Sequence, residues 1–267
     1  MADKNSENNI HARRDFLKKT VFAATAGLTA SSLISSTGCS ATQTSAHGPF
    51  KLTEKNNIIL FQGDSITDWG RTRSRENTPN DSQCLGSGYV LLTAAKILAE
   101  YPKDKPVIYN RGISGNKVFQ LAERWDKDCI SLKPALVSIL VGVNDYWHTL
   151  TEKYNGTLET YQNDYRALLE RTKKELPGVT LVICEPFVLK CGSVTQGWFP
   201  AFDGYRAAAK NLAEEFKTIF VPLQSTFDEA VKNAPPQYWT IDGVHPTVAG
   251  ACLMAKTWLK TVFGINC

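Results

Sequence analysis

The chain of 267 residues has no long apolar run, almost no excess of one charge and few histidines. No stretch reaches the roughly 18 to 20 charge-free apolar residues that a membrane-spanning helix needs. The 30 Lys and Arg residues stand against 26 Asp and Glu, and the surplus of +4 is too small and too scattered to predict a nucleic-acid-binding surface. With four histidines and no cluster of ligand residues, we expect no metal site.

The composition that remains is that of a globular protein. Apolar residues make up 43% and charged residues 21% of the chain, which is enough to form a hydrophobic core. A disordered, collagen-like or miniature disulfide-framework protein is therefore excluded. The seven cysteines are an odd number, so at least one of them has no partner within the chain.

The N-terminus carries a pattern typical of an export signal. Arg13 and Arg14 precede Phe16, Leu17 and a mildly apolar segment over residues 20–34. This order resembles the bacterial twin-arginine export motif. The alternative interpretation is an amphipathic N-terminal helix of the folded domain.

A second signal follows the apolar segment. Gly38-Cys39 resembles a lipoprotein processing site, at which the cysteine thiol receives the lipid, although Ser36 stands where leucine is usual. Ordinary cleavage nearby is the alternative. We therefore predict an export signal over residues 1–38, a lipidated or flexible tether over 39–56 and one domain over 57–267. The protein is expected to leave the bacterial cytoplasm and to be periplasmic or a membrane-anchored lipoprotein, with no other membrane contact.

Lipidation of Cys39 would leave six cysteines. The patterns around Cys184 and Cys252 are those of a strand and a helix, so a buried thiol is expected at both positions. Cys184 and Cys191 are close enough in sequence to bridge a loop, but spacing alone leaves their pairing open.

The body of the chain alternates strands and helices. Short apolar runs predict strands over residues 58–61, 107–109, 135–141, 179–184 and 219–221. Helical periodicity predicts helices over residues 89–100, 158–176, 205–216 and 248–263. Strands separated by helices favour a parallel sheet covered on both faces, with ligands beyond the carboxyl ends of the strands.

Four segments with chemically active residues follow these strands or lie in the last loop. They are Gly-Asp-Ser-Ile-Thr at 63–67, Asn-Arg-Gly-Ile-Ser-Gly-Asn at 110–116, Gly-Val-Asn-Asp at 142–145 and Asp-Gly-Val-His-Pro-Thr at 242–247. Each has another interpretation by itself. Ser65 or Asp64 is suited to cap a helix, residues 63–67 to cradle a phosphate or flavin, and the glycines to turn the chain.

Together the four segments supply every role that acyl transfer requires. Ser65 is placed to attack, His245 to take its proton and Asp242 to orient the imidazole from three residues away. The backbone N–H groups of Ser65 and Gly115 and the Asn144 amide are placed to form an oxyanion hole.

These four segments resemble those of the GDSL/SGNH hydrolase family, in the same order over residues 58–263. The resemblance implies a flavodoxin-like three-layer α/β/α sandwich with five parallel strands, and no cofactor. It also implies that Ser65, Gly115, Asn144 and His245 are the four family residues, with Asp242 completing the triad. Gly115 is chosen over Gly112 because the oxyanion glycine of similar proteins follows the asparagine by five. The other large serine-hydrolase fold is not expected, because Thr67 stands where its Gly-x-Ser-x-Gly elbow requires glycine.

Seven residues near the expected site, five of them aromatic, are candidates for substrate contact. They are Asp64, Trp69, Arg71, Tyr146, Trp147, Phe187 and Trp239. The aromatic rings are suited to stack on sugar rings or on an acyl group, although core packing is the alternative for several of them. Arg71, Arg73 and Arg75 are either a solvated run or a grip on an acidic sugar. His148, four residues after Asn144, either lines the cleft or is a surface residue.

The sequence therefore predicts a serine ester hydrolase acting on a small-molecule or glycan ester, with an acetyl ester of a carbohydrate favoured. A lysophospholipase or thioesterase for longer acyl chains is the first alternative. A surface lipoprotein that binds glycans without turnover and a flavodoxin-like mononucleotide binder are the others. The oligomeric state is not predicted.

Overall fold

The computed structural model describes residues 50–151 and 154–266. The predicted export signal, Cys39 and the first part of the tether lie outside these residues. Within the described ranges, no helix has both the length and the apolar character to span a membrane.

Five parallel strands form one sheet in the order β2-β1-β3-β4-β5. They are β1 (Ile58–Gly63), β2 (Val107–Asn110), β3 (Leu136–Leu140), β4 (Thr180–Cys184) and β5 (Ile219–Val221). All five residues of β3 are buried, as expected of a central strand with helices on both faces. The strand order reverses at β1, whose neighbours are β2 and β3, so the crevice beyond the carboxyl ends of β1 and β3 is the expected place for a ligand.

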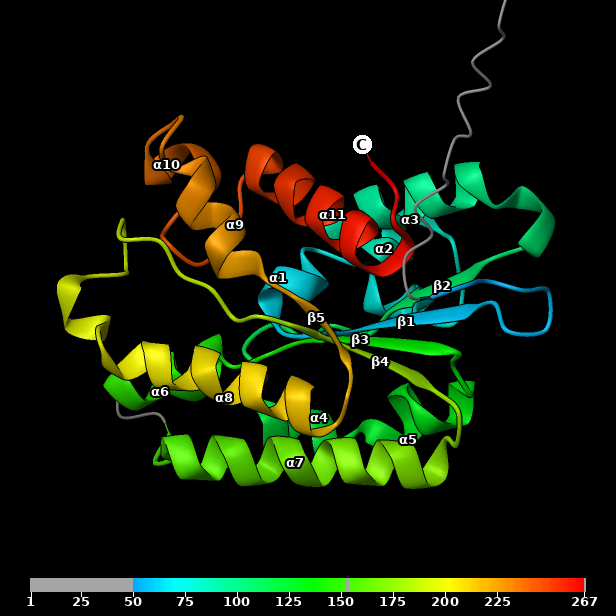
Figure 1. Ribbon diagram of the computed structural model, residues 1–267, viewed down its shortest axis with the longest axis horizontal. Helices are drawn as coiled ribbons and strands as arrows, with labels where there is room; N and C mark the ends of the chain where they lie inside the picture. Colours follow the sequence, from blue (N-terminus) through cyan, green and yellow to red (C-terminus); the bar gives the residue numbers. More distant parts are fainter. Residues whose placement is uncertain (1–49, 152–153, 267) are drawn as a thin grey trace, which may run out of the picture. The chain divides into compact units, whose positions relative to one another are not determined.

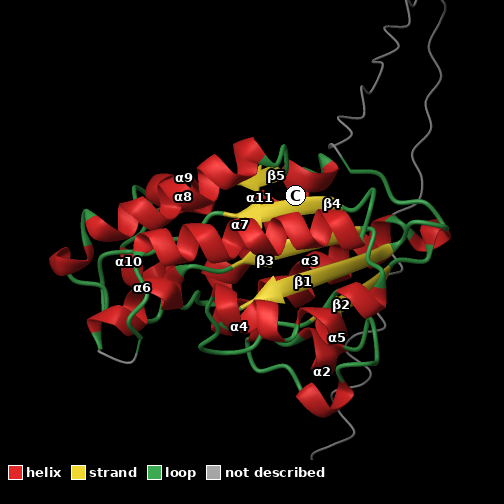
Figure 2. Cartoon of the chain, turned by 90° about the horizontal axis from the view of Figure 1, so that it is seen from below, coloured by secondary structure: helices red, strands yellow, loops and turns green. Residues whose placement is uncertain are grey.

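Helices cover both faces of the sheet (Figure 1). The α-helices are α1 (Ser65–Asp68), α2 (Ser82–Leu85), α3 (Tyr89–Glu100), α4 (Val118–Glu123), α5 (Trp125–Asp128), α6 (Val143–Leu150), α7 (Leu158–Glu175), α8 (Ala201–Glu215), α9 (Leu223–Ala230), α10 (Pro236–Trp239) and α11 (Val248–Phe263). Short 3-10 turns lie at Arg73–Arg75, Pro102–Asp104, Ile130–Leu132 and Gln196–Trp198. In Figure 1, α3, α9 and α11 lie above the sheet, and α4, α5, α7 and α8 lie below it. Figure 2, seen from below, shows the lower layer in front of the strands.

The predicted fold class, a three-layer sandwich with a five-stranded parallel sheet, is confirmed. The helix α8 begins four residues before the predicted start, directly after Pro200. The helices α2, α4, α5, α6, α9 and α10 were not predicted. Helix α6 was missed because it begins within Gly-Val-Asn-Asp, where Asn and Asp favour a cap or turn over a helix interior.

The predicted tether reaches too far into the domain. Phe50 and Leu52 are buried in the core, and the Phe50 ring lies 5.6 Å from that of Phe263. The Phe50 N–H also donates to the Val262 carbonyl at 3.1 Å. The folded domain therefore includes residues from at least Phe50 onwards.

The five cysteines within the described residues are all free thiols. Cys184 and Cys191 are both buried and do not bridge. Cys252 is exposed, which corrects the expectation of a buried thiol. The helix α11 buries Ala251, Met254 and Ala255, and its turn of about 100° per residue carries position 252 to the solvent side.

Candidate active site

Ser65 begins α1 directly beyond the carboxyl end of β1. The turn is ordered by Asp64, whose Oδ1 accepts the Ile66 N–H at 3.0 Å. This is the N-cap interaction expected of an aspartate at a helix start. Ser65 itself is partly accessible to solvent, while its neighbours on either side are buried. The local sequence thus presents one hydroxyl at the end of a central strand.

His245 lies in the last loop of the chain, between α10 and α11. The loop is closed by the Ile241 N–H, which donates to the His245 carbonyl at 2.7 Å. Gly243 has a φ of 93°, and a side chain at this position would collide with the carbonyl oxygens of Leu189 and Cys191. Glycine is therefore required for the loop to lie this close to the segment after β4.

Two hydrogen bonds join Ser65, His245 and Asp242 in a line. The Ser65 Oγ lies 2.8 Å from Nε2 of His245, and Nδ1 of the same ring lies 2.8 Å from Oδ2 of Asp242. Because Nδ1 faces a carboxylate, it carries the proton in the neutral ring and leaves Nε2 free to accept from the serine. The arrangement is that of a hydroxyl, a base and a group that orients the base.

The Asp242 carboxylate is held in its ionised form by the loop around it. Burial raises its pKa, but hydrogen bonds from the His245 N–H, the His245 ring and the Val244 N–H outweigh burial and hold the pKa below its ordinary value. Oδ1 receives the two backbone N–H groups, at 2.8 Å from His245 and 3.0 Å from Val244. The second oxygen is thereby directed at the imidazole.

Gly115 and Asn144 follow the two strands that adjoin β1 in the sheet. Gly115 follows β2 in a loop with partial exposure, and Asn144 lies in the first turn of α6 after β3. The Asn144 amide donates to the Asn116 carbonyl at 3.4 Å, so the amide lies against the loop that carries Gly115. Both candidate oxyanion donors therefore belong to one hydrogen-bonded region at the crevice.

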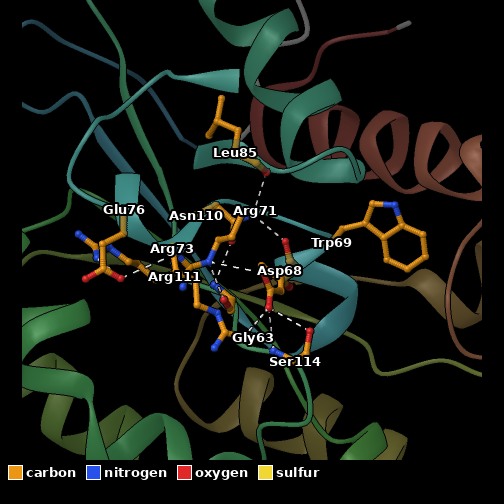
Figure 3. Close-up of polar contacts among 12 residues, drawn as sticks. Gly63, Asp68, Trp69, Arg71, Arg73, Glu76, Leu85, Asn110, Arg111 and Ser114 are labelled. Atoms are coloured by element: carbon orange, nitrogen blue, oxygen red, sulfur yellow. Dashed lines mark hydrogen bonds and ion pairs between the residues drawn. The ribbon is translucent and has the colours of Figure 1, made fainter. Parts of the chain in front are cut away.

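Asp68 joins the Ser65 helix to the Gly115 loop. Its Oδ2 accepts the Ser114 N–H at 3.0 Å and the Ser114 hydroxyl at 2.9 Å. The Arg73 guanidinium donates to the same oxygen at 2.9 Å (Figure 3). The position of Gly115 relative to Ser65 thus depends on a side chain that the sequence analysis did not identify.

Asn110, the last residue of β2, also connects α1 with the loop that carries Gly115. Its amide donates to the carbonyls of Thr67 at 2.6 Å and Leu85 at 2.9 Å. Its Oδ1 accepts the Gly112 N–H at 2.9 Å. Asn110 was visible in the sequence as part of a motif, but its contacts with α1 and α2 depend on the fold.

Two further carboxyl groups belong to the residue directly before Ser65 and the residue directly after Asn144. Asp64 and Asp145 are buried, and burial is the largest influence that raises the pKa of each to about 7. Asp145 accepts the Val118 N–H at 3.1 Å through Oδ1, which ties α6 to the start of α4. In each residue Oδ2 is buried without a hydrogen-bond partner. The structure therefore corrects the expectation that Asp64 contacts substrate, because its side chain points into the protein.

The arginine run does not form a grip for an acidic sugar. The Arg71 side chain is wholly buried, and its Nε donates to the Gly112 carbonyl at 2.7 Å (Figure 3). Arg73 pairs with Asp68, and Arg75 pairs with Asp81 at 2.8 Å. Arg73 and Arg75 are therefore paired with carboxylates of the protein, and the prediction that Arg71 contacts substrate is wrong because its side chain is buried.

The candidate aromatic residues divide into two groups. The Trp69 and Trp147 rings lie 5.9 and 6.3 Å from the His245 ring, and both residues are partly exposed. In Figure 3 the Trp69 side chain points away from the arginine network. Trp69 and Trp147 therefore flank the imidazole and are accessible to a substrate.

The other predicted aromatic contacts are packing residues. Tyr146 is buried against Trp198 and neighbouring rings, and Phe187 is wholly buried and stacked on Phe227 at 4.4 Å. Trp239 donates its indole N–H to the Ala234 carbonyl at 3.1 Å. The prediction of substrate contact is wrong for Tyr146 and Phe187, and the Trp239 indole is engaged within its own turn.

No metal-binding constellation is present in the described part of the chain, where no three His, Cys, Asp or Glu side chains converge. The site instead consists of one hydroxyl, one imidazole, one ionised carboxylate and amide donors. This set is suited to nucleophilic attack on a carbonyl carbon.

Comparison with known proteins places this geometry in context. The model of the GDSL-like lipase/acylhydrolase family matches residues 61–252. An acetylxylan esterase from Geobacillus stearothermophilus is 35% identical over 208 residues, covering 76% of this chain and 93% of that protein.

Solved structures agree with the sequence matches. A protein from Parabacteroides merdae described as a GDSL-like lipase is 55% identical, with a TM-score of 0.76 over 79% of this chain and 97% of the other. The solved acetylxylan esterase from Geobacillus stearothermophilus is 35% identical, with a TM-score of 0.67 over 77% of this chain and 93% of the other.

Proposed function

The chain belongs to the GDSL-like lipase/acylhydrolase family and is a carboxylic ester hydrolase, and we propose that it removes acetyl groups from carbohydrates with Ser65 as nucleophile. The observation that carries this proposal is the line of two 2.8 Å hydrogen bonds from Ser65 through His245 to Asp242. The line lies at the crevice beyond the strand-order reversal, where ligands of such sheets bind.

The reaction begins with attack of the Ser65 Oγ on the ester carbonyl carbon. His245 takes the hydroxyl proton through Nε2, and Asp242 stabilises the resulting imidazolium through Nδ1. The negative charge on the carbonyl oxygen is received by the backbone N–H groups of Ser65 and Gly115 and by the Asn144 amide. These donors are fixed in advance, so they stabilise the transition state without reorganisation.

The second half of the reaction reverses the proton flow. The His245 imidazolium gives its proton to the departing sugar oxygen, which leaves an acetyl group on Ser65. Water then loses a proton to His245 and attacks the acetyl carbon. The breakdown of this second tetrahedral species returns the proton to the Ser65 Oγ and releases acetate.

Two observations support the catalytic set and the acetyl-sugar substrate. The relative from Geobacillus stearothermophilus is an acetylxylan esterase, and its catalytic mutants replace a serine, an aspartate and a histidine. The aspartate and histidine of that enzyme stand three positions apart, as Asp242 and His245 do here. Trp69 and Trp147 beside His245 add partly exposed ring faces of the kind on which sugars stack.

A release assay tests this function. Purified protein is incubated separately with acetylated xylan and with a lysophospholipid, and acetate and long-chain fatty acid are measured. The proposal predicts acetate from the polysaccharide, no fatty acid from the lipid, and no acetate above background with Ser65→Ala. Fatty acid release without acetate would show a lysophospholipase instead, and glycan binding without any turnover would show a binding protein.

We also propose that the enzyme is exported and held at a membrane by a lipid on Cys39, from the twin-arginine-like and Gly-Cys motifs of the N-terminus. Intact-mass analysis of the membrane fraction is expected to show a lipid-modified N-terminal Cys39. Wild-type protein without a lipid on Cys39, or a Cys39→Ser variant that stays associated with the membrane as the wild type does, would contradict the anchor.

A further inference from the structure

Trp69, which directly follows α1, has a backbone conformation that is unusual for a tryptophan. Its φ of 34° and ψ of 56° lie in the left-handed region, which glycine adopts freely and a bulky residue only against steric repulsion. Residues of this kind persist where the surrounding structure holds them, and they cluster at functional sites. Glycine at position 69 would relieve the strain, so the indole is expected to have a role.

Hydrogen bonds hold the Trp69 backbone on both sides. Its N–H donates to the Ser65 carbonyl at 3.0 Å. Its carbonyl accepts the Ser87 N–H at 3.0 Å and the Ser87 hydroxyl at 3.2 Å. The point from which the indole projects is therefore fixed relative to both the Ser65 turn and the segment before α3.

Gly88, the residue before α3, leaves room for the Trp69 side chain. A methyl group at position 88 would lie 2.9 Å from both Cβ and Cγ of Trp69, closer than such atoms approach one another in proteins. The φ of Gly88 is −102°, so its backbone lies outside the left-handed region that favours glycine. The contact with Trp69 is therefore the reason that this position requires glycine.

The indole held in this way lies beside the imidazole of the proposed base. The centres of the Trp69 and His245 rings are 5.9 Å apart, and their planes are tilted by 35°. Trp69 is partly exposed, and its side chain points away from the arginine network (Figure 3). In the proposed mechanism Nε2 of His245 protonates the departing alcohol oxygen, which must lie within hydrogen-bond reach of the imidazole. The alcohol part of the substrate therefore departs next to the indole.

The second indole near His245 belongs to another element of the site. Trp147 lies three residues after Asn144 on α6, so the two side chains project from the same face of that helix. The Trp147 ring also lies 5.6 Å from the ring of Trp198, which is buried. Trp147 is thus associated with the oxyanion amide and the core, whereas Trp69 projects from the turn of the nucleophile.

We propose that Trp69, positioned by Gly88, is a specificity residue that stacks on the sugar ring carrying the scissile acetyl ester. A flat indole face gives a sugar ring a large apolar contact, which an alcohol without a ring does not gain. This inference rests on the proposed function, because it assigns the recognition of the alcohol part to one side chain. It gives the site a means to distinguish acetylated sugars from small alkyl acetates.

The test compares acetylated xylobiose with methyl acetate, whose alcohol has no ring. Trp69→Asn replaces the indole with a residue that tolerates the left-handed conformation, and Trp69→Phe retains an aromatic ring. Gly88→Ala should displace the indole without altering it chemically. Gly197→Ala is the matched control, because Gly197 is exposed and a methyl group there would meet only the Thr195 hydroxyl, at an ordinary 3.5 Å.

The quantity measured is the ratio of kcat/KM for acetylated xylobiose to that for methyl acetate. We expect Trp69→Asn to lower this ratio about 10-fold or more, mainly through KM for the sugar acetate. Gly88→Ala should lower the ratio as well, Trp69→Phe should retain part of it, and Gly197→Ala should match the wild type.

Tryptophan fluorescence reports the ring contact itself. In Ser65→Ala protein, acetylated xylobiose is expected to change the fluorescence on binding, and adding Trp69→Phe should remove most of that change. An unchanged ratio in Trp69→Asn would overturn the inference, as would an equal loss on both substrates, which would mean that the indole only supports His245. Wild-type protein that cleaves methyl acetate but not acetylated xylobiose would instead overturn the proposed sugar specificity.

Discussion

The Ser65 hydroxyl oxygen lies 2.8 Å from Nε2 of His245, although 180 residues separate the two positions in the chain. The parallel sheet brings them together, because β1 ends at the serine turn and the last loop returns over the same edge before α11. His245 has a local partner in Asp242, three residues away, but the Ser65 hydroxyl meets the imidazole only through the fold. The contact is therefore a property of the whole fold.

Replacement of Asp242 by Asn is expected to lower kcat by roughly 10³- to 10⁴-fold. The amide retains an oxygen for the backbone N–H groups of Val244 and His245, so the loop keeps its shape. It no longer stabilises the imidazolium or fixes the proton on Nδ1. Steady-state hydrolysis of 4-nitrophenyl acetate measures the effect, and a loss below 10-fold would remove Asp242 from the mechanism.

Replacement of Asn144 by Ala is expected to lower kcat by about 10²- to 10³-fold with little change in KM. The lost amide acts on the charge that develops on the carbonyl oxygen, which the ground state lacks. Initial rates over a range of substrate concentrations separate the two constants. A rise in KM at constant kcat would instead indicate that Asn144 serves ground-state binding.

Gly243 in the loop of His245 can be compared with a control glycine, Gly178, because both have a positive φ. Gly178 has a φ of 89° with no heavy atom within 4 Å of an added methyl group, so Gly178→Ala should cost about 1–2 kcal/mol of folding stability and retain activity. Gly243→Ala adds a collision with the carbonyls of Leu189 and Cys191, which should cost about 1–3 kcal/mol more and displace His245. Urea unfolding and esterase rates test both variants. Equal effects of the two substitutions would contradict the tight packing of the His245 loop.

The buried Asp64 predicts an unusual dependence of stability on pH. Its pKa is about 7 in the folded protein, against 3.8 for the free side chain, so between about pH 4 and 7 the folded state holds a proton that the unfolded chain releases. This contribution to the unfolding free energy is present below pH 4 and is lost as pH rises through 7.

The variant Asp64→Asn keeps the capping oxygen and should remove that part of the pH dependence. Denaturant unfolding at pH 5 and pH 8 is therefore expected to show a smaller loss of stability at pH 8 in the variant than in the wild type. A pH dependence identical to that of the wild type would mean that Asp64 is ionised in the folded protein throughout this range.

The sequence predicted the sheet well because each strand is short, apolar and followed by helical periodicity. The residues of β3 and β4 are buried on both faces, which produces a continuous apolar run that is visible without a structure. The helix α6 was missed because the residues that form the site also begin the helix. The Asn144 amide donates to the Asn116 carbonyl and the Asp145 carboxyl accepts the Val118 N–H, while the backbone of both residues already belongs to α6.

Residues that carry a chemical role were easier to predict than those that position them. Ser65, Asp242 and His245 stand in short motifs with fixed spacing, whereas Asp68 and Asn110 act through partners 46 and 43 positions away. Arg71 is an error in the other direction. It was predicted to contact substrate because it is a charged residue close to the serine motif in the sequence. Its burial under the Gly112 carbonyl follows only from the packing of the loop after β2.

Covalent labelling tests the central claim, the nucleophilic role of Ser65, most directly. The purified protein is treated with a fluorophosphonate, digested, and the adduct is located by mass spectrometry while esterase activity is followed in the same sample. We predict one adduct, on Ser65, formed in step with the loss of activity, and neither labelling nor turnover in Ser65→Ala. Activity that persists in fully labelled protein, or turnover undiminished in Ser65→Ala, would contradict the account.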